Sequence, residues 1–188
     1  MYQLVALRDS VRVPPKFLES DTKAAVKKAL QENVEGMLDK DLGVVLCVTD
    51  VREIGDGKII PGDGAVYYDT SFEALVYTPE LQETVDGEII EIVEFGAFVR
   101  LGPVDGLVHV SQVADDFMSY SKEGALQGKA STRSIKVGDK VRARIVTLSL
   151  KHNSPSKVGL TMRQPGLGKL EWLEEDRKKK AEPKKASK

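Results

Sequence analysis

The sequence predicts an α+β fold, in which a small domain with a helix packed on an antiparallel sheet precedes a five-stranded β-barrel and a C-terminal helix. Three observations support this prediction. Residues 1–80 contain a helical pattern between β-branched runs. Residues 81–168 contain short alternating runs separated by turn residues, which is typical of a barrel. Residues 169–188 begin with a helical pattern and end in a basic run.

The front domain is expected to begin with a strand and a helix. Residues 1–13 alternate moderately between apolar and polar side chains and end at two prolines, which stop a hydrogen-bonded ladder. The next apolar positions recur at spacings of four, four and three residues, which predicts a helix with one buried face. These positions are Val26, Leu30, Val34 and Met37. Ser20 or Asp21 is expected to cap the helix, and Gly36 to lie near its end.

Two further strands are expected in the front domain. Residues 43–51 are apolar at both odd and even positions, which indicates a strand that is covered on both faces and central in its sheet. Residues 72–77 form the next strand, and residues 78–84 are expected to join the two domains. Cys47 is the only cysteine, so it can form no internal disulfide, and we expect it to be a small buried hydrophobic residue in a reducing compartment.

A glycine-rich segment separates these two strands. Residues 54–64 contain four glycines and one proline. A phosphate-binding loop is not indicated, because no Gly-Lys-Ser/Thr follows and the order of elements fits neither nucleotide fingerprint. The glycines are expected to adopt positive φ in a tight exposed excursion. They are Gly55, Gly57, Gly62 and Gly64. Two interpretations stay open, namely a bare exposed loop and a shaped docking tip.

The second domain is expected to supply the barrel strands. They are expected at residues 87–93, 97–101, 108–110, 141–150 and 158–162. Gly96 interrupts the chain between the first two, and residues 114–133 are expected to form an irregular connection with about one helical turn. Five strands in this arrangement fit an OB fold.

Two neighbouring strands place aromatic and cationic side chains on one face. Successive side chains of a strand point to opposite faces. If the aliphatic residues of 97–101 face the core, Phe98 and Arg100 point outward, and His109 is set against two valines in the next strand. A phenyl ring, a guanidinium and an imidazole on one wet face suit stacking on nucleobases and pairing with phosphates.

Structural roles remain possible for the same residues. Phe95 could plug one end of the barrel, and Phe98 could pack under residues 114–133 instead of facing solvent. His109 taken alone is more often a structural histidine. Arg142 and Arg144 are at positions of their strand that point away from the core. The pattern fits a solvated face and RNA contact equally well.

The C-terminal residues form a separate segment, 169–188. Residues 169–180 have helical character, and we expect the only tryptophan, Trp172, to anchor this helix on the protein or on a partner. Residues 177–188 contain seven basic residues and one acidic residue, and they are expected to be disordered and at most weakly attracted to RNA.

Composition and charge exclude several classes of protein. No apolar run approaches the roughly 18 residues of a membrane helix, and no signal peptide is expected. Two histidines and one cysteine give no cluster expected to hold zinc. Residues 1–80 carry nine basic and fourteen acidic residues, whereas residues 81–188 carry nineteen and fifteen. The back half is therefore the candidate for binding nucleic acid.

The barrel sequence resembles the OB-type RNA-binding domain that is named after a small-subunit ribosomal protein. The matching residues are Gly87, then Phe95-Gly96-Ala97-Phe98-Val99, then Gly106-Leu107-Val108-His109-Val110-Ser111. The resemblance implies that Phe95, Phe98 and His109 contact RNA. Many such domains carry an Asp in the turn before the last strand, but residues 151–157 contain no acid. This departure favours phosphate contact through Lys151 or Lys157 and sequence-tolerant binding.

Four stretches together resemble one family over nearly the whole chain. They are MYQLVALRDSVRVPP, GDGKIIPGDG, FEALVYTPE and LTMRQPGLG. The family is the E-prime subunit of archaeal RNA polymerase, which is similar to the seventh-largest subunit of the eukaryotic polymerases. The resemblance implies a cytoplasmic, non-catalytic stalk subunit without a cofactor, whose front domain has a truncated ribonucleoprotein fold. It implies that the small helical F subunit of the polymerase packs along both domains as a heterodimer partner, and that the OB face guides nascent RNA.

The same resemblance implies that the glycine-rich tip docks on the polymerase core near the clamp. The residues implied are Gly55, Asp56, Gly57, Pro61, Gly62, Asp63 and Gly64. Two alternatives remain. One is a free-standing RNA-binding factor of translation or RNA decay. The other is a ribonuclease, although residues 1–80 contain no histidine, and Asp56, Asp63 and Asp69 suit turns better than catalysis.

Overall fold

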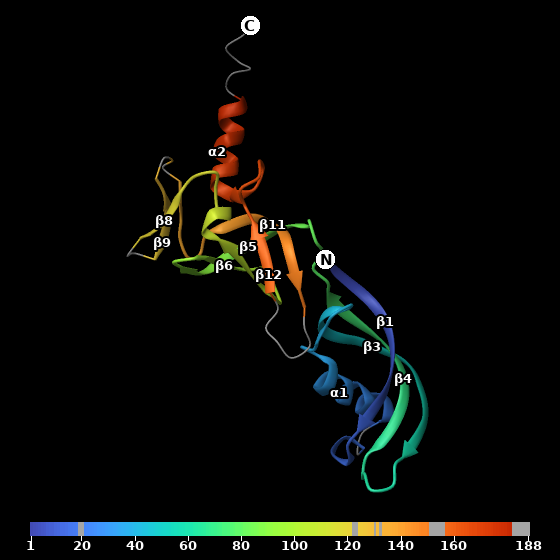
Figure 1. Cartoon of the computed structure of the whole chain (residues 1–188). Helices are drawn as coiled ribbons and strands as arrows, with labels where there is room; N and C mark the ends of the chain where they lie inside the picture. Colours follow the sequence, from blue (N-terminus) through green and yellow to red (C-terminus); the bar gives the residue numbers. More distant parts are fainter. Residues whose placement is uncertain (19–20, 122–123, 130, 132, 151–156, 182–188) are drawn as a thin grey trace. The chain divides into compact units, whose positions relative to one another are not determined.

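The computed structural model describes residues 1–18, 21–121, 124–129, 131, 133–150 and 157–181. These residues fall into two compact units, each with its own sheet (Figure 1). The first unit is Met1–Thr78, and the second consists mainly of Pro79–Ser149 and residues 157–181. The predicted α+β class is confirmed, with a helix and a sheet in the first unit and a β-barrel in the second.

The first unit is built on a four-stranded antiparallel sheet in the order β1-β4-β3-β2. The strands are β1 (Tyr2–Val13), β2 (Leu38–Asp39), β3 (Gly43–Ile59) and β4 (Val66–Tyr77). β3 lies between β4 and β2, as expected, but β2 pairs only with Gly43 and Val44, so most of β3 is at the edge of the sheet. Its apolar pattern has another cause. Register shifts in the β3–β4 pair leave Val45, Val48 and Val51 buried at intervals of three.

One helix, α1 (Thr22–Val34), covers this sheet, and a short helix η1 (Pro15–Phe17) precedes it. The buried face of α1 consists of Ala25, Val26, Ala29 and Leu30, which pack with aliphatic residues of β1, β3 and β4. Gly36 follows the helix with φ +79°, as predicted. Met37 was expected on the buried face, but it is exposed because the helix ends at Val34.

The glycine-rich segment is mostly a hairpin and not a loop. β3 continues to Ile59, and Gly57 and Ile59 are still paired with Tyr68 and Val66 of β4. The turn itself is therefore confined to residues 60–65. Positive φ was expected at all four glycines, yet Gly62 alone has it, at φ +92°. The other three glycines do not need the left-handed conformation.

The second unit contains a closed five-stranded barrel. Its strands are β5 (Thr84–Val93), β6 (Gly96–Arg100), β7 (Asp105–His109), β11 (Lys140–Ser149) and β12 (Lys157–Thr161). They are ordered β12-β7-β6-β5-β11, and pairing of β12 with β11 closes the sheet. A two-residue strand β13 (Gly168–Lys169) adds to β11. Ile89, Val99, Val108, Ile145 and Leu160 fill the interior.

The connection between β7 and β11 is more regular than expected. It contains a 3₁₀ turn, η2 (Val110–Gln112), and a three-stranded sheet. The strands of this sheet are β8 (Met118–Ser121), β9 (Ala125–Gly128) and β10 (Ser134–Ile135). The prediction of an irregular segment was wrong because the strands are short and their alternation involves small and polar residues. We call this three-stranded sheet the insertion sheet.

The chain continues into α2 (Leu170–Ala181). Trp172 is 8% exposed, and the Arg133 guanidinium lies 5.2 Å from the centre of its ring. The predicted anchoring of this helix on the protein is thereby confirmed. Of the segment expected to be disordered, residues 177–181 instead belong to α2, and residues 182–188 lie outside the described part of the chain. No described helix is long and apolar enough to span a bilayer.

Candidate nucleic-acid interface

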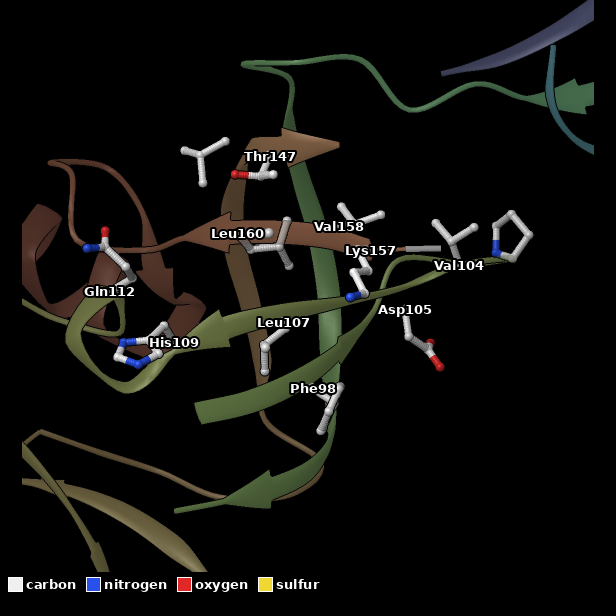
Figure 2. A pocket seen from close by; sticks show the side chains of 13 residues that line it. Phe98, Val104, Asp105, Leu107, His109, Gln112, Thr147, Lys157, Val158 and Leu160 are labelled. Carbon is white, nitrogen blue, oxygen red and sulfur yellow. The ribbon is translucent and has the colours of Figure 1, made fainter. Parts of the chain in front are cut away.

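An open groove of about 910 Å³ runs over β6, β7 and β12. Figure 2 shows Asp105, Leu107 and His109 along β7, with Phe98 from the neighbouring strand β6 and Lys157 at the start of β12. The strand register explains this grouping, because Phe98 is paired with Leu107 and β12 runs parallel to β7. The side chains of these strands that point away from the barrel core therefore lie on the same outer surface.

Two aromatic rings stand at the β6 side of this groove. The centres of the Phe95 and Phe98 rings are 6.4 Å apart, and the rings meet edge to face at 84°. Phe95 is 53% exposed, so it does not plug the barrel, which was one of the two roles left open. Phe98 is partly buried and lines the groove. The edge-to-face contact fixes the orientation of both rings, which suits a stacking platform.

His109 is the last residue of β7, and its side chain points away from the barrel core. The Ser111 amide donates to its Nδ1 at 3.3 Å, and the Ser111 hydroxyl lies 2.8 Å from the same atom. Because a backbone N–H can only donate, Nδ1 is an acceptor, and in the neutral ring the proton is on Nε2. The contact caps η2 and fixes the imidazole. Nε2 is then a donor suited to a phosphate or base oxygen.

The predicted cations are distributed unevenly. Lys157 is the single Lys or Arg among the described residues that line the groove. Arg100 lies 3.9 Å from the Asp105 carboxylate. Arg142 donates from two nitrogens to Asp86, at 2.6 and 2.8 Å, and this hydrogen bonding lowers the pKa of Asp86. The phosphate role expected of Arg142 therefore competes with a solvent-exposed ion pair between β11 and β5.

Two other cations were predicted to contact RNA, namely Arg144 and Lys151. Arg144 is partly buried and does not line it, and its Nε has no hydrogen-bond partner among the described residues. Lys151 lies outside the described residues. The structure thus brings together Phe98, His109 and Lys157, with Phe95 adjacent, and it does not bring Arg142 or Arg144 to them.

Sequence reasoning missed several lining residues. Leu107 shares the outward parity of His109, so strict alternation could have found it. Val146 and Thr147 line the groove because the β11–β12 register shifts between Ile145 and Thr147. No pattern in the sequence marks that irregularity.

The hairpin tip of the first unit is a second candidate site. Of the residues expected to dock, three are in β3, and Pro61, Gly62, Asp63 and Gly64 form the turn. Those in β3 are Gly55, Asp56 and Gly57. Ile59, which precedes the turn, is 75% exposed.

Asp63 ties this turn to the sheet. Its carboxylate accepts from Arg12 Nε and Nη2 at 2.8 and 2.7 Å, from the Tyr67 hydroxyl at 2.8 Å, and from the Ala65 amide at 3.1 Å. The Arg12 and Tyr67 hydrogen bonds hold the pKa of Asp63 well below its usual range. The hydrogen bond between Tyr67 and Asp63 also raises the pKa of Tyr67. The tip is therefore a braced projection with an exposed apolar edge.

Comparison with known proteins agrees with this architecture. Residues 8–64 match the family described as "SHS2 domain found in N terminus of Rpb7p/Rpc25p/MJ0397". Residues 78–156 match the family described as "S1 RNA binding domain". The fold and the groove therefore define a class, namely a protein that combines an SHS2 domain with an S1-type OB barrel.

Relatives narrow this class to a particular family. DNA-directed RNA polymerase subunit Rpo7 of Sulfolobus acidocaldarius is 40% identical over 177 residues, which cover 94% of this chain and 97% of that protein. Rpo7 of Saccharolobus solfataricus is 39% identical, with 95% and 100% covered. RNA polymerase II subunit RPB7 of Saccharomyces cerevisiae is 26% identical, with 77% and 86% covered. The chain belongs to the Rpo7 family of DNA-directed RNA polymerase subunits, which confirms the resemblance found in the sequence.

Proposed function

We propose that this chain is a non-catalytic stalk subunit that docks on the polymerase core through its hairpin tip, pairs with the F subunit, and binds nascent single-stranded RNA on its barrel. The observation that carries the proposal is the groove of the S1-type barrel, where Phe98, His109 and Lys157 share one wall. The surface is apolar and aromatic with few charges, which is the composition of a stacking site and not of a hydrolytic centre.

RNA is held in this groove mainly through its bases. A base stacks on Phe98, whose ring is supported edge-on by Phe95. Leu107 provides apolar contact beside it, and Nε2 of His109 donates to an oxygen of the strand. Lys157 supplies the positive charge that pairs with phosphate. The described residues of the groove do not form a fixed set of donors and acceptors that matches a single base. Binding therefore tolerates different sequences.

Docking on the core is assigned to the braced tip. Ile59 and Ile60 are exposed at the end of a hairpin whose turn is held by the Arg12–Asp63 contact. Exposed apolar side chains on a rigid projection are costly to solvate and suit insertion into a protein pocket. Ile59→Asp combined with Ile60→Asp is expected to abolish capture by purified core polymerase and to leave RNA binding unchanged.

A second protein partner is supported by the edge of the front sheet. β1 is an edge strand, and Met1, Tyr2 and Leu4 expose apolar surface near its start. Covering by the F subunit accounts for this exposure. Leu4→Asp is expected to weaken co-purification with the F subunit in a sizing experiment, and Ile59→Asp is the matched control that leaves it intact.

The RNA proposal is tested by fluorescence anisotropy with a labelled oligouridylate over a range of salt concentrations. Phe98→Ala is expected to cost about 1–3 kcal/mol of binding free energy, which is the usual value of one base stack. Val137→Ala removes an exposed apolar side chain that is not among the described residues of the groove, and it is expected to change nothing.

Salt dependence separates the cations. Each phosphate contact on a single strand contributes about −0.7 to the slope of log K against log salt. Lys157→Ala is expected to lower the slope by about that amount. Arg142→Ala is expected to change it less, because Arg142 is paired with Asp86. Unchanged affinity in Phe98→Ala together with an unchanged slope in Lys157→Ala would contradict RNA binding in this groove.

A further inference from the structure

A second open pocket lies where the barrel leads into the insertion sheet. It has a volume of about 410 Å³, within the range of sites that hold small organic groups. Val110 and Ser111 of η2, residues 114–118, and Arg163 line it. None of these residues belongs to the groove over β6, β7 and β12. The pocket is therefore separate from the interface described above.

The aromatic wall of this pocket is Phe117, which is 67% exposed. The Lys129 ammonium lies 4.5 Å from the centre of its ring. The Phe117 backbone amide donates to Asp116 at 2.6 Å, and the other oxygen of Asp116 accepts from the amide and hydroxyl of Ser131 at 2.8 and 2.7 Å. Asp116 thus links the chain just before β8 to Ser131. A fixed, exposed ring next to a cation suits stacking of a base and pairing with its phosphate.

The polar wall consists of Asp115 and Arg163. Arg163 Nε and Nη2 donate to one oxygen of Asp115, at 2.8 and 2.6 Å. A guanidinium has five N–H donors, so this contact leaves donors for a phosphate or a base oxygen. The second oxygen of Asp115 is suited to accept from an exocyclic amino group. A donor and an acceptor side by side at the rim favour a nucleobase over a purely apolar ligand.

The pocket adjoins the RNA groove at η2. His109 lines the groove, and the next two residues, Val110 and Ser111, line the pocket. Ser111 also holds the imidazole of His109, and the Val110 amide donates to the carbonyl of Phe95 at 2.9 Å. One short, hydrogen-bonded turn therefore forms a wall of both sites. A strand that passes His109 reaches the pocket next.

We propose that this pocket is a second nucleotide subsite for the same single-stranded RNA, with a base stacked on Phe117 and with Lys129 and Arg163 facing its phosphates. The proposal rests on RNA binding in the groove and extends it onto the insertion sheet. A strand bound at both sites has a longer footprint than the barrel alone provides.

The test compares two lengths of oligouridylate bound to the full chain, about 4 and about 12 nucleotides, which span much of the range of site sizes for one OB fold. Phe117→Ala is expected to weaken binding of the long oligomer about fivefold or more and to leave the short one nearly unchanged. Phe98→Ala is expected to weaken both. Lys129→Ala is expected to lower the salt slope of the long oligomer by about 0.7. Val137→Ala is the matched exposed control.

A second measurement does not depend on affinity. A long oligomer containing 4-thiouridine is expected to crosslink, on irradiation, to the peptide that contains Phe117. If Phe98→Ala weakens RNA binding while Phe117→Ala does not and no such crosslink forms, the subsite is wrong and the groove stands. If no variant affects binding of either oligomer, the groove and the subsite are both wrong. Thermal unfolding of each variant, followed by the fluorescence of Trp172, shows whether the barrel is folded.

Discussion

Replacing Gly96 by alanine probes the contact that sets the β6–β7 pair. Gly96 is paired with His109, and a Cβ added to it would lie 2.2 Å from the carbonyl oxygen of Val108 and 3.1 Å from the Cα of His109. Real Cβ atoms essentially never approach closer than 3.0 Å. Both obstructing atoms are backbone, so no side-chain rotation relieves the clash. The φ of Gly96 is not positive, so the cost comes from contact and not from a left-handed conformation.

We expect Gly96→Ala to destabilise the barrel by about 3 kcal/mol, the upper part of the usual range for overpacking. The comparison is Gly138→Ala in the same unit. Gly138 has φ +89° and nothing within 4 Å of an added Cβ, so this change isolates backbone strain of about 1–2 kcal/mol. Urea unfolding followed by fluorescence reports on this unit, because its buried Trp172 is the only tryptophan of the chain. A midpoint for Gly96→Ala no lower than that for Gly138→Ala would refute the steric argument.

Three further predictions concern ion pairs and the C-terminal helix. The Arg12 contact lowers the pKa of Asp63, so its contribution to stability is present above about pH 4, the unfolded value, and is lost as the pH falls toward the folded pKa. Thermal unfolding of the front unit by circular dichroism should therefore depend less on pH between 5 and 2 in Asp63→Asn than in the parent chain. Asp86→Asn and Arg142→Gln should each cost no more than about 1 kcal/mol, and their costs in the double variant should not add. Trp172→Ala should cost about 3 kcal/mol, measured by circular dichroism in urea, because the indole is buried.

The barrel could be predicted from sequence because its signals are local. Alternation over residues 97–101 fixes which side chains enter the core, and β6 follows that pattern with Ala97 and Val99 fully buried. The outward direction of Phe98 follows from the same parity. The groove could therefore be anticipated in its aromatic part, since the strand that carries His109 obeys the same rule and lies next to β6.

Other features depend on pairing between strands, which no local pattern records. In β3, register shifts place buried valines at intervals of three, so a strand that seemed covered on both faces is largely covered on one. The hairpin from Gly57 to Tyr68 was hidden because glycine and proline outnumber the β-branched residues there. The insertion sheet was missed because its strands have two to four residues, too short for a period to be recognised.

The alternation of side chains along a strand shows which way a cation points, but not whether it is free to bind a ligand. On the barrel unit, Arg100, Arg142 and Arg163 each lie against an aspartate, and two of these aspartates come from a neighbouring strand in register. Residues 81–168 as a whole carry eleven basic and ten acidic residues. Long-range attraction of a polyanion to this surface is therefore weak, so in the proposed RNA complex affinity would come from stacking in the groove. In that complex few phosphates would be neutralised and stacking would not depend on base identity, so the proposed binding would not fix the register of the strand.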